Sequence, residues 1–149
     1  MHINFTCLPE NYTPQFFLDL YNSFPNAFLV AAVRDKIAGY IMCRIEVGFP
    51  ETGGIGIVKK GHIVSLAVLP EYRRMGVGEA LTLKAMDAMS DYGAKECFLE
   101  VRVSNLAAIN LYEKLGFRTA KKCLGYYSDG ESALVMARKL GTDVSSQAS

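Results

Sequence analysis

Apolar residues recur in runs of strand length along most of the chain. Six such runs are separated by polar or glycine-containing segments: 27–33, 37–45, 62–69, 96–103, 117–124 and 132–140. Runs of this kind predict β-strands. The first two are joined by the charged residues 34–36 and the last two flank a turn at 126–130, so each pair is expected to form an antiparallel hairpin. In the fourth run Phe98, Glu100 and Arg102 point one way, and the apolar residues between them point the other way.

Three other segments repeat apolar residues at helical spacing. The first follows Thr13 and Pro14, an N-cap and a first-turn proline. Its apolar stripe consists of Phe16, Phe17, Leu20, Tyr21 and Phe24. The second stripe, which ends before Gly93, consists of Val77, Leu81, Ala85, Ala88 and Tyr92. A third helix is expected over 106–115, with Ser104-Asn105 as its cap.

The order of these elements predicts an α/β fold. We expect one domain over residues 1–140, with a mixed, mostly antiparallel central sheet flanked by helices on both faces. A chain of 149 residues with 50% hydrophobic composition suits a single packed core. The glycine-rich stretch 48–61 is predicted to be a loop, and the small polar residues 141–149 a disordered tail.

The composition excludes several functional classes. The chain has 16 basic and 15 acidic residues, so it lacks the basic excess typical of nucleic-acid-binding proteins. Four cysteines, Cys7, Cys43, Cys97 and Cys123, are far apart and have no histidine partners at zinc-ligand spacing, which predicts free thiols and no metal site. No apolar stretch is long enough for a membrane helix and no signal pattern is present, so a cytoplasmic protein is expected.

Residues 64–81 carry the most informative pattern. An apolar strand stops at Pro70, and a helix then starts on the spacing R-x-x-G-x-G, which is formed by Arg73, Gly76 and Gly78. Glycines at a helix N-terminus let several N–H groups face one point, which suits a phosphate group. The spacing differs from those of the P-loop and the dinucleotide fingerprint, so neither ATP nor NAD is indicated. From these residues alone, a plain turn with solvated arginines is the alternative.

A second segment, residues 101–117, has the pattern V-x-x-x-N-x-x-A-x-x-L-Y-x-x-x-G-F. Together with the turn at 70–78, it resembles the GNAT superfamily of N-acetyltransferases. The resemblance implies acetyl-CoA as co-substrate, with its pyrophosphate on backbone amides of the turn and its pantetheine arm on Asn105. The implied cofactor-binding residues are Leu66, Ala67, Val68, Arg73, Arg74, Met75, Gly76, Val77, Gly78, Glu79, Asn105, Asn110 and Tyr112.

Three more segments, at 8–12, 60–65 and 125–133, resemble the NatA-type N-terminal acetyltransferases and their archaeal relatives. In that family the first and last segments form opposite walls of a slot for the start of a peptide. The resemblance covers residues 1–140 and implies a protein or peptide N-terminus as substrate. The implied substrate-binding residues are Leu8, Pro9, Glu10, Tyr12, Arg102, Tyr126 and Tyr127. The family's first strand is missing before Leu8, so either an upstream start or an unpaired sheet edge is expected.

The resemblance also implies three catalytic residues. Tyr112 approaches the cofactor's sulfur in the family, and a phenol of pKa about 10 can act as general acid toward the leaving thiolate. Glu10 and His62 are the candidates to position or deprotonate the amine, directly or through water. Taken alone, each has an ordinary explanation: Tyr112 as a packed helix aromatic, Glu10 as a solvated charge, and His62 as a strand residue bound to a neighbour.

The expected reaction is direct attack of a neutral amine on the thioester. Backbone amides near 66–68 would hold the oxyanion, and no metal is needed. None of the cysteines lies in a motif with an obvious base, which argues against a covalent route. An α-amine of pKa about 8 is roughly a tenth neutral at pH 7, far more than a lysine of pKa about 10.4. The alternatives are an acetyltransferase for lysine or a small amine, and a non-catalytic acyl-CoA-binding module.

Overall fold

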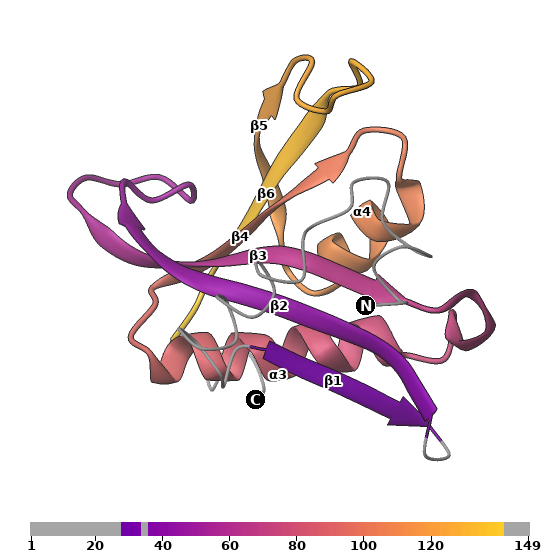
Figure 1. Cartoon of the computed structure of the whole chain (residues 1–149). Coiled ribbons are helices and arrows are strands. Elements are labelled where there is room, and N and C mark those ends of the chain that lie inside the picture. The colour runs from indigo at the N-terminus through magenta and orange to yellow at the C-terminus, as the bar shows by residue number, and fades with distance from the viewer. Residues whose placement is uncertain (1–27, 34–35, 142–149) are drawn as a thin grey trace. The chain divides into compact units, whose positions relative to one another are not determined.

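The computed structural model describes residues 28–33 and 36–141 (Figure 1). The predicted first helix, the predicted tail from residue 142 onward and the candidate residues Leu8, Pro9, Glu10 and Tyr12 lie outside the described residues. The described elements are β1 (Phe28–Val33), β2 (Lys36–Gly48), β3 (Val58–Val68), the short 3₁₀ turn η2 (Pro70–Tyr72), α3 (Val77–Asp91), β4 (Glu96–Arg102), α4 (Leu106–Lys114), β5 (Arg118–Cys123) and β6 (Ala133–Lys139).

The six strands form one mixed sheet in the order β1-β2-β3-β4-β6-β5. β3 and β4 are parallel, whereas β1 and β2, β4 and β6, and β5 and β6 are antiparallel. Both predicted hairpins are therefore confirmed, as is the mixed α/β sheet. By their contacts the described residues divide into two compact units, those up to residue 44 with 63–91, and residues 45–62 with those from 92 onward. β2 and β3 contribute residues to both units.

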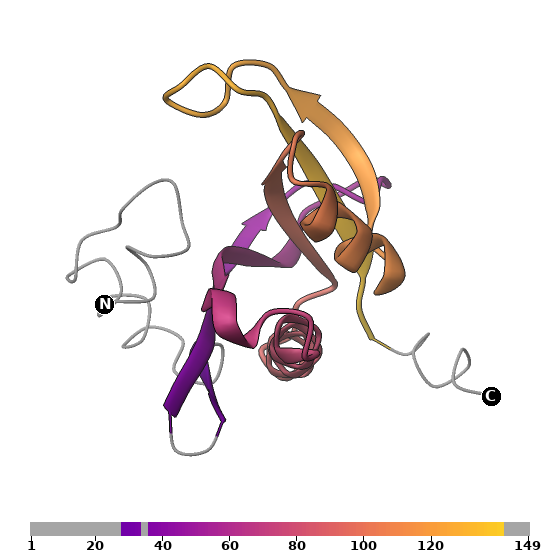
Figure 2. The same cartoon turned by 90° about the vertical axis from the view of Figure 1, so that its right-hand side faces the viewer.

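In the first unit α3 packs against β1 (Figure 1), and Figure 2 looks along the axis of this helix. The predicted stripe is confirmed at Leu81, Ala85 and Ala88. The full buried face is wider and consists of Leu81, Thr82, Ala85, Met86, Ala88 and Met89. Because two adjacent positions per turn are buried, α3 presents a broad face, not a narrow seam.

A close approach joins β2 to β3 in the same unit. The Leu69 N–H donates to the Ala38 carbonyl at 2.8 Å. A Cβ built on Gly39 would lie 2.6 Å from the Ala67 carbonyl oxygen, which real Cβ atoms do not tolerate. A glycine at position 39 therefore lets β2 approach β3 closely at Ala67, one of the strand residues that were predicted to contact the cofactor.

In the second unit β4 lies between β3 and β6. Its antiparallel register with β6 runs from Glu96 opposite Lys139 to Arg102 opposite Ala133. The core of this unit includes Cys97, Leu99, Val101, Leu115, Phe117, Val135 and Met136. The predicted alternation along β4 is confirmed by its contacts, because Phe98, Glu100 and Arg102 carry the polar and aromatic interactions described below.

The predicted loop over residues 48–61 is wrong at its C-terminal end, because β3 begins at Val58. The parallel ladder with β4 pairs Lys60 with Glu96, Gly61 with Cys97 and His62 with Phe98. Lys60 is only 7% exposed, and a buried lysine is not expected from the sequence pattern. It is tolerated because its ammonium group lies 3.1 Å from a Glu51 carboxylate oxygen and 4.6 Å from the centre of the Phe98 ring.

Candidate active site

The turn between β3 and α3, together with the first residues of α3, contains seven of the thirteen predicted cofactor-binding residues, from Arg73 to Glu79. Arg74 and Gly76 have positive φ angles of 65° and 79°. A Cβ on Gly76 would meet no heavy atom within 4 Å, so the backbone conformation and not crowding favours glycine there. The chain then enters α3 at Val77, and helix geometry leaves the first N–H groups of α3 without carbonyl partners inside the helix.

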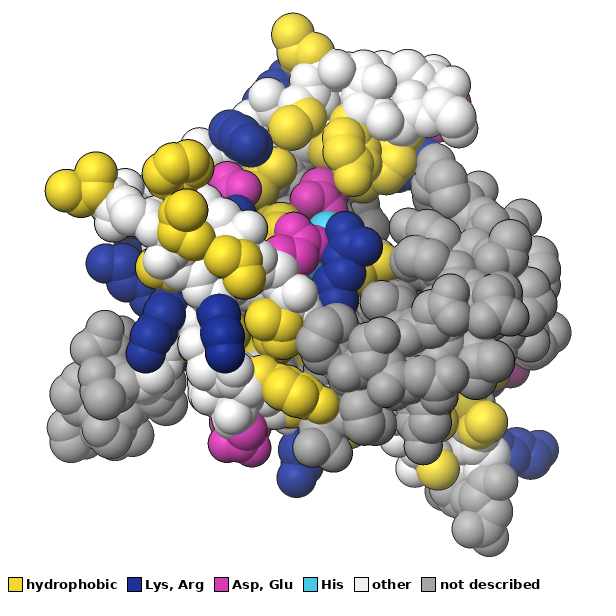
Figure 3. Space-filling view, turned by 60° about the vertical axis from the view of Figure 1, so that its left-hand side comes forward, with side chains coloured by type: hydrophobic (Ala, Val, Ile, Leu, Met, Phe, Trp, Pro, Cys, Tyr) yellow, Lys and Arg dark blue, Asp and Glu magenta, His cyan; other side chains and the backbone are white. Residues whose placement is uncertain are grey.

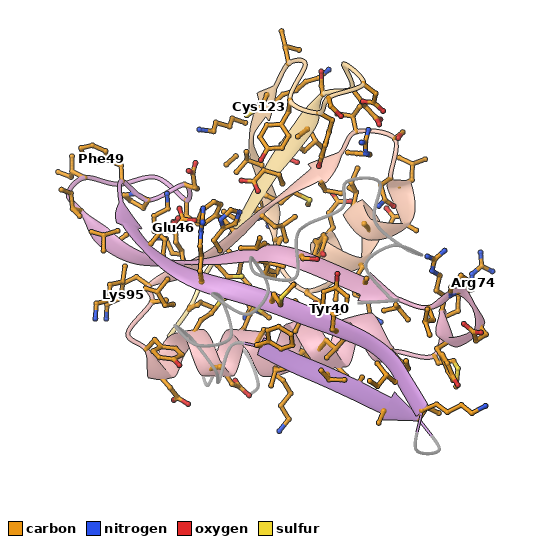
Figure 4. All side chains as sticks on the ribbon, in the orientation of Figure 1. Tyr40, Glu46, Phe49, Arg74, Lys95 and Cys123 are labelled. Atoms are coloured by element: carbon orange, nitrogen blue, oxygen red, sulfur yellow. The ribbon has the colours of Figure 1, made fainter. Side chains whose placement is uncertain are left out.

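The same turn gathers positive charge. Arg73 and Arg74 are exposed, and Figure 4 shows Arg74 projecting from the turn. The Arg73 Nε donates to the Val68 carbonyl at 3.1 Å, which ties the turn to the end of β3. Arginines beside the positive end of a helix suit a phosphate or pyrophosphate group, so the residues present fit that part of acetyl-CoA.

Of the other predicted cofactor-binding residues, Leu66, Ala67 and Val68 end β3, and the last three lie on α4 and its N-cap. Asn105 is its N-cap and accepts the Ala108 N–H at 3.2 Å, as the sequence predicts. Asn110 is exposed on the helix. Tyr112 is 5% exposed, and its ring packs edge-on against Phe117 at 5.5 Å between centroids. Tyr112 is therefore a packed helix aromatic, and its role as a general acid stays a prediction.

Two short polar contacts in the second unit involve His62. Its Nδ1 lies 2.6 Å from an oxygen of Glu46 on β2, and its Nε2 lies 2.7 Å from an oxygen of Glu100 on β4. We call Glu46, His62 and Glu100 the carboxylate–histidine row. The parallel ladder explains it, because His62 pairs with Phe98 and stacks on that ring at 4.3 Å, and Glu100 lies two residues further on the same face.

The row favours a charged imidazole. Only an imidazolium has N–H groups on both ring nitrogens, and both nitrogens here face carboxylates. Burial acts to lower the pKa of His62, but the hydrogen bond and charge of Glu100, together with those of Glu46, outweigh it and raise the pKa above 6.5. Figure 3 shows a histidine side chain beside acidic ones on one face. Figure 4 labels Glu46 on β2.

The connection between β2 and β3 is anchored beside this row. The buried Glu96 carboxylate accepts the N–H groups of Glu51 and Thr52, at 2.7 and 3.0 Å, and the Thr52 hydroxyl at 2.8 Å. Glu51 in turn binds Lys60, whose charge lies over the Phe98 ring that stacks on His62. Phe49, labelled in Figure 4, is 71% exposed in this connection. A chain of side-chain contacts thus links the connection to the row.

Arg102 contacts the turn that carries Tyr126 and Tyr127. One guanidinium nitrogen lies 2.9 Å from Asp129 and 2.8 Å from Glu131. The guanidinium carbon lies 4.0 Å from the centre of the Tyr127 ring, a cation–π geometry. The structure therefore brings together two of the predicted substrate-binding residues, Arg102 and Tyr127. Tyr126 is 52% exposed and packs edge-on against Tyr127 at 5.0 Å.

Sequence reasoning missed the acidic partners of these residues. Glu46 and Glu100 flank His62, and Asp129 and Glu131 flank Arg102, yet none of the four was a candidate. The alternation along β4 placed Glu100 on the side of Phe98 and Arg102, which is the one signal that pointed to it. Glu46 could not be found in this way, because its contact depends on the register between strands.

Comparison with known proteins shows the family. Residues 1–117 match the model of the acetyltransferase (GNAT) family. The chain belongs to this family. It is 51% identical over 140 residues to the N-alpha-acetyltransferases of Sulfurisphaera tokodaii and Saccharolobus solfataricus, and these residues cover 93% of this chain and 84% of each relative. It is also 39% identical to the catalytic subunit NAA10 of the N-terminal acetyltransferase A complex of Arabidopsis thaliana, over 92% of this chain and 69% of that protein.

Solved structures of this family have the same fold. Ard1 from Thermoplasma volcanium matches with a TM-score of 0.80 and 32% identity, over 95% of this chain and 88% of that chain. Chaetomium thermophilum Naa20, solved with a bisubstrate analogue, matches with a TM-score of 0.83 and 29% identity, over 97% of this chain and 84% of that chain. Within the described residues of this protein, no helix has the length and apolar character needed to cross a membrane.

Proposed function

We propose that this acetyltransferase moves the acetyl group of acetyl-CoA to the free α-amino group of protein or peptide N-termini. Its membership of the GNAT family supports the co-substrate and the reaction class. The relatives named N-alpha-acetyltransferase, at 51% identity over most of the chain, support the α-amine as acceptor. The free Cys43, Cys97 and Cys123 agree with a reducing cytoplasm as the compartment.

The carboxylate–histidine row is the observation that carries this proposal, because it can handle an amine. Two carboxylates and one imidazolium carry a net negative charge, which attracts the ammonium form of a substrate. The ammonium must lose a proton before nitrogen can attack. We assign that proton to the row in the fraction of molecules in which His62 is neutral, whose ring nitrogen accepts it directly or through one water.

The raised pKa of His62 suits an α-amine in particular. A general base works best when its pKa approaches that of the group it deprotonates. The α-amino group has a pKa near 8, whereas lysine has one of about 10.4. His62, whose pKa is raised above 6.5, is therefore closer to the α-amine than an ordinary histidine is. Glu10, outside the described residues, remains a second candidate to position the amine.

The remaining roles follow from the residues of the turn and of α4. We assign the pyrophosphate to the turn at 73–79 and the pantetheine arm to Asn105, whose side-chain oxygen is engaged in the helix cap and whose NH₂ group would donate. Backbone amides of residues 66–68 would stabilise negative charge on the carbonyl oxygen. The Tyr112 hydroxyl would donate to the departing sulfur, and its buried, packed ring would fix its position.

The test is acetyl transfer to three versions of one short peptide. The first has a free N-terminus and one internal lysine, the second is N-terminally blocked with the lysine kept, and the third has a free N-terminus without lysine. Mass spectrometry locates the acetyl group while CoA release gives the rate. We expect turnover of the first and third peptides only, with acetylation at the α-amine. Turnover of the blocked peptide at a rate equal to the others, or of a polyamine alone, would contradict the proposal.

A further inference from the structure

Glu131 joins two parts of the second unit that the proposed function assigns to different substrates. One of its carboxylate oxygens accepts the main-chain N–H of Ser104 at 3.0 Å, and the other accepts Arg102 at 2.8 Å. Ser104 directly precedes Asn105, the N-cap of α4. Glu131 itself ends the turn that carries Tyr127, since the Tyr127 N–H donates to the Glu131 carbonyl at 3.0 Å.

Hydrogen bonds of the neighbouring residues Ser132 and Asp129 support the contacts of Glu131. The Val103 N–H donates to the Ser132 carbonyl at 3.1 Å, so the main chain is also joined there. Asp129 accepts the Glu131 N–H at 3.0 Å and shares the Arg102 guanidinium, which also covers the Tyr127 ring. The Asp129 carboxylate is 61% exposed, whereas that of Glu131 is 23% exposed. Of these two acids, Glu131 is the one bonded to the backbone that leads into α4.

We infer that Glu131 is a positioning residue that couples cofactor binding at the start of α4 to the conformation of the peptide-binding turn at 126–131. The inference rests on the proposed function, which places the pantetheine arm at Asn105 and the peptide beside Tyr127. Because one carboxylate binds both Ser104 and Arg102, any ordering of the Ser104 backbone is passed to Arg102 and through it to the Tyr127 ring.

This coupling is not a pH switch near neutrality. Hydrogen bonds from Ser104 and then from Arg102 lower the pKa of Glu131, and the Glu131 backbone and Arg102 lower that of Asp129. Both carboxylates therefore stay ionised throughout the physiological range, and the contacts around Arg102 persist at every pH at which the enzyme is assayed. The coupling depends on the ligand.

The test follows amide hydrogen exchange of the full chain by NMR, with and without acetyl-CoA and with no peptide present. In the wild type, we expect acetyl-CoA to slow exchange of the Tyr127 and Gly130 N–H groups, both bonded within the turn, by about fivefold to tenfold. In Glu131→Gln the slowing should disappear while acetyl-CoA still binds. The matched control is Asp129→Asn, which removes a carboxylate from the same Arg102 but keeps the Ser104 contact and should keep the slowing.

Kinetics give a second readout that a merely structural role would not produce. Glu131→Gln should raise the peptide KM by about fivefold with kcat unchanged, because no residue assigned to proton transfer is altered. Equal slowing of exchange in Glu131→Gln and wild type would overturn the inference, as would a wild type whose turn does not respond to acetyl-CoA. If the turn responds but no N-terminus is acetylated, the coupling stands and the proposed acceptor fails.

Discussion

The turn before α3 and the carboxylate–histidine row are built in opposite ways. The turn uses main-chain N–H groups, two positive φ angles and two exposed arginines, all within a few residues of one another. The row uses three charged side chains from β2, β3 and β4, at positions 46, 62 and 100. The pyrophosphate that we assign to the turn is the same in every reaction, so a local backbone site would suffice for it. An amine that must lose a proton needs groups whose pKa can be adjusted by neighbours.

The largest expected effect comes from removing the charge of the row. In Glu100→Gln, we expect kcat/KM to fall by about 100-fold, because His62 loses the partner that contributes most to its raised pKa and the row loses a negative charge that attracts the amine. Steady-state CoA release measures this. Glu113→Gln, an exposed acid on α4, is the control and should keep wild-type rates. A loss of less than about threefold in Glu100→Gln would remove the row from the mechanism.

Tyr112→Phe separates packing from chemistry on α4. We expect kcat to fall by about 10- to 100-fold, because the departing sulfur loses its proton donor. The ring still packs against Phe117, so the free energy of unfolding should fall by no more than about 1.5 kcal/mol, the value of a single hydrogen bond. Urea denaturation checks the second number. An unchanged kcat would leave Tyr112 as a core aromatic only.

The turn can be tested through its backbone. In Gly76→Ala, the residue must hold a φ of 79°, which costs an alanine about 1–2 kcal/mol. We expect the KM for acetyl-CoA to rise by about tenfold, since 1.4 kcal/mol corresponds to that factor, with the peptide KM unchanged. Gly53→Ala is the matched control, because Gly53 also has a positive φ and open space around it but lies between β2 and β3. A rise of acetyl-CoA KM in both variants would indicate general destabilisation.

The smallest effect on activity should come from substituting Glu96, whose carboxylate anchors the β2–β3 connection. Glu96→Gln places an NH₂ group among donors, so that one or two of the three hydrogen bonds to this 1% exposed carboxylate are lost. We expect the free energy of unfolding to fall by about 1–3 kcal/mol, with kcat/KM retained below the melting transition. Thermal unfolding followed by circular dichroism measures the loss. If Glu96→Gln is as stable as wild type, these hydrogen bonds do not contribute to stability, because water replaces them.

Much of the fold and the turn could be predicted from sequence because the determinants are local. The strand runs, the Asn105 cap and the glycine spacing of the turn each depend on residues close together in the chain. β3 was predicted to begin too late because Lys60 and Gly61 are poor strand residues until Glu51 and the Phe98 ring accommodate the lysine. The partners of His62 and Arg102 were missed for the same reason: they lie 16 to 38 residues away and depend on strand register.

The most direct test of the row is an NMR titration of the His62 ring protons. The chain has two histidines, so a His2→Gln background leaves one signal to follow in the presence and absence of Glu100→Gln. We expect a midpoint above 6.5 with Glu100 intact and a lower midpoint in Glu100→Gln. Because folding raises the pKa of His62, the charged row stabilises the fold fully below about pH 6.5. This stabilisation is lost as the pH rises through the raised pKa. A midpoint at or below 6.5 with Glu100 intact, or one that Glu100→Gln does not move, would contradict the account.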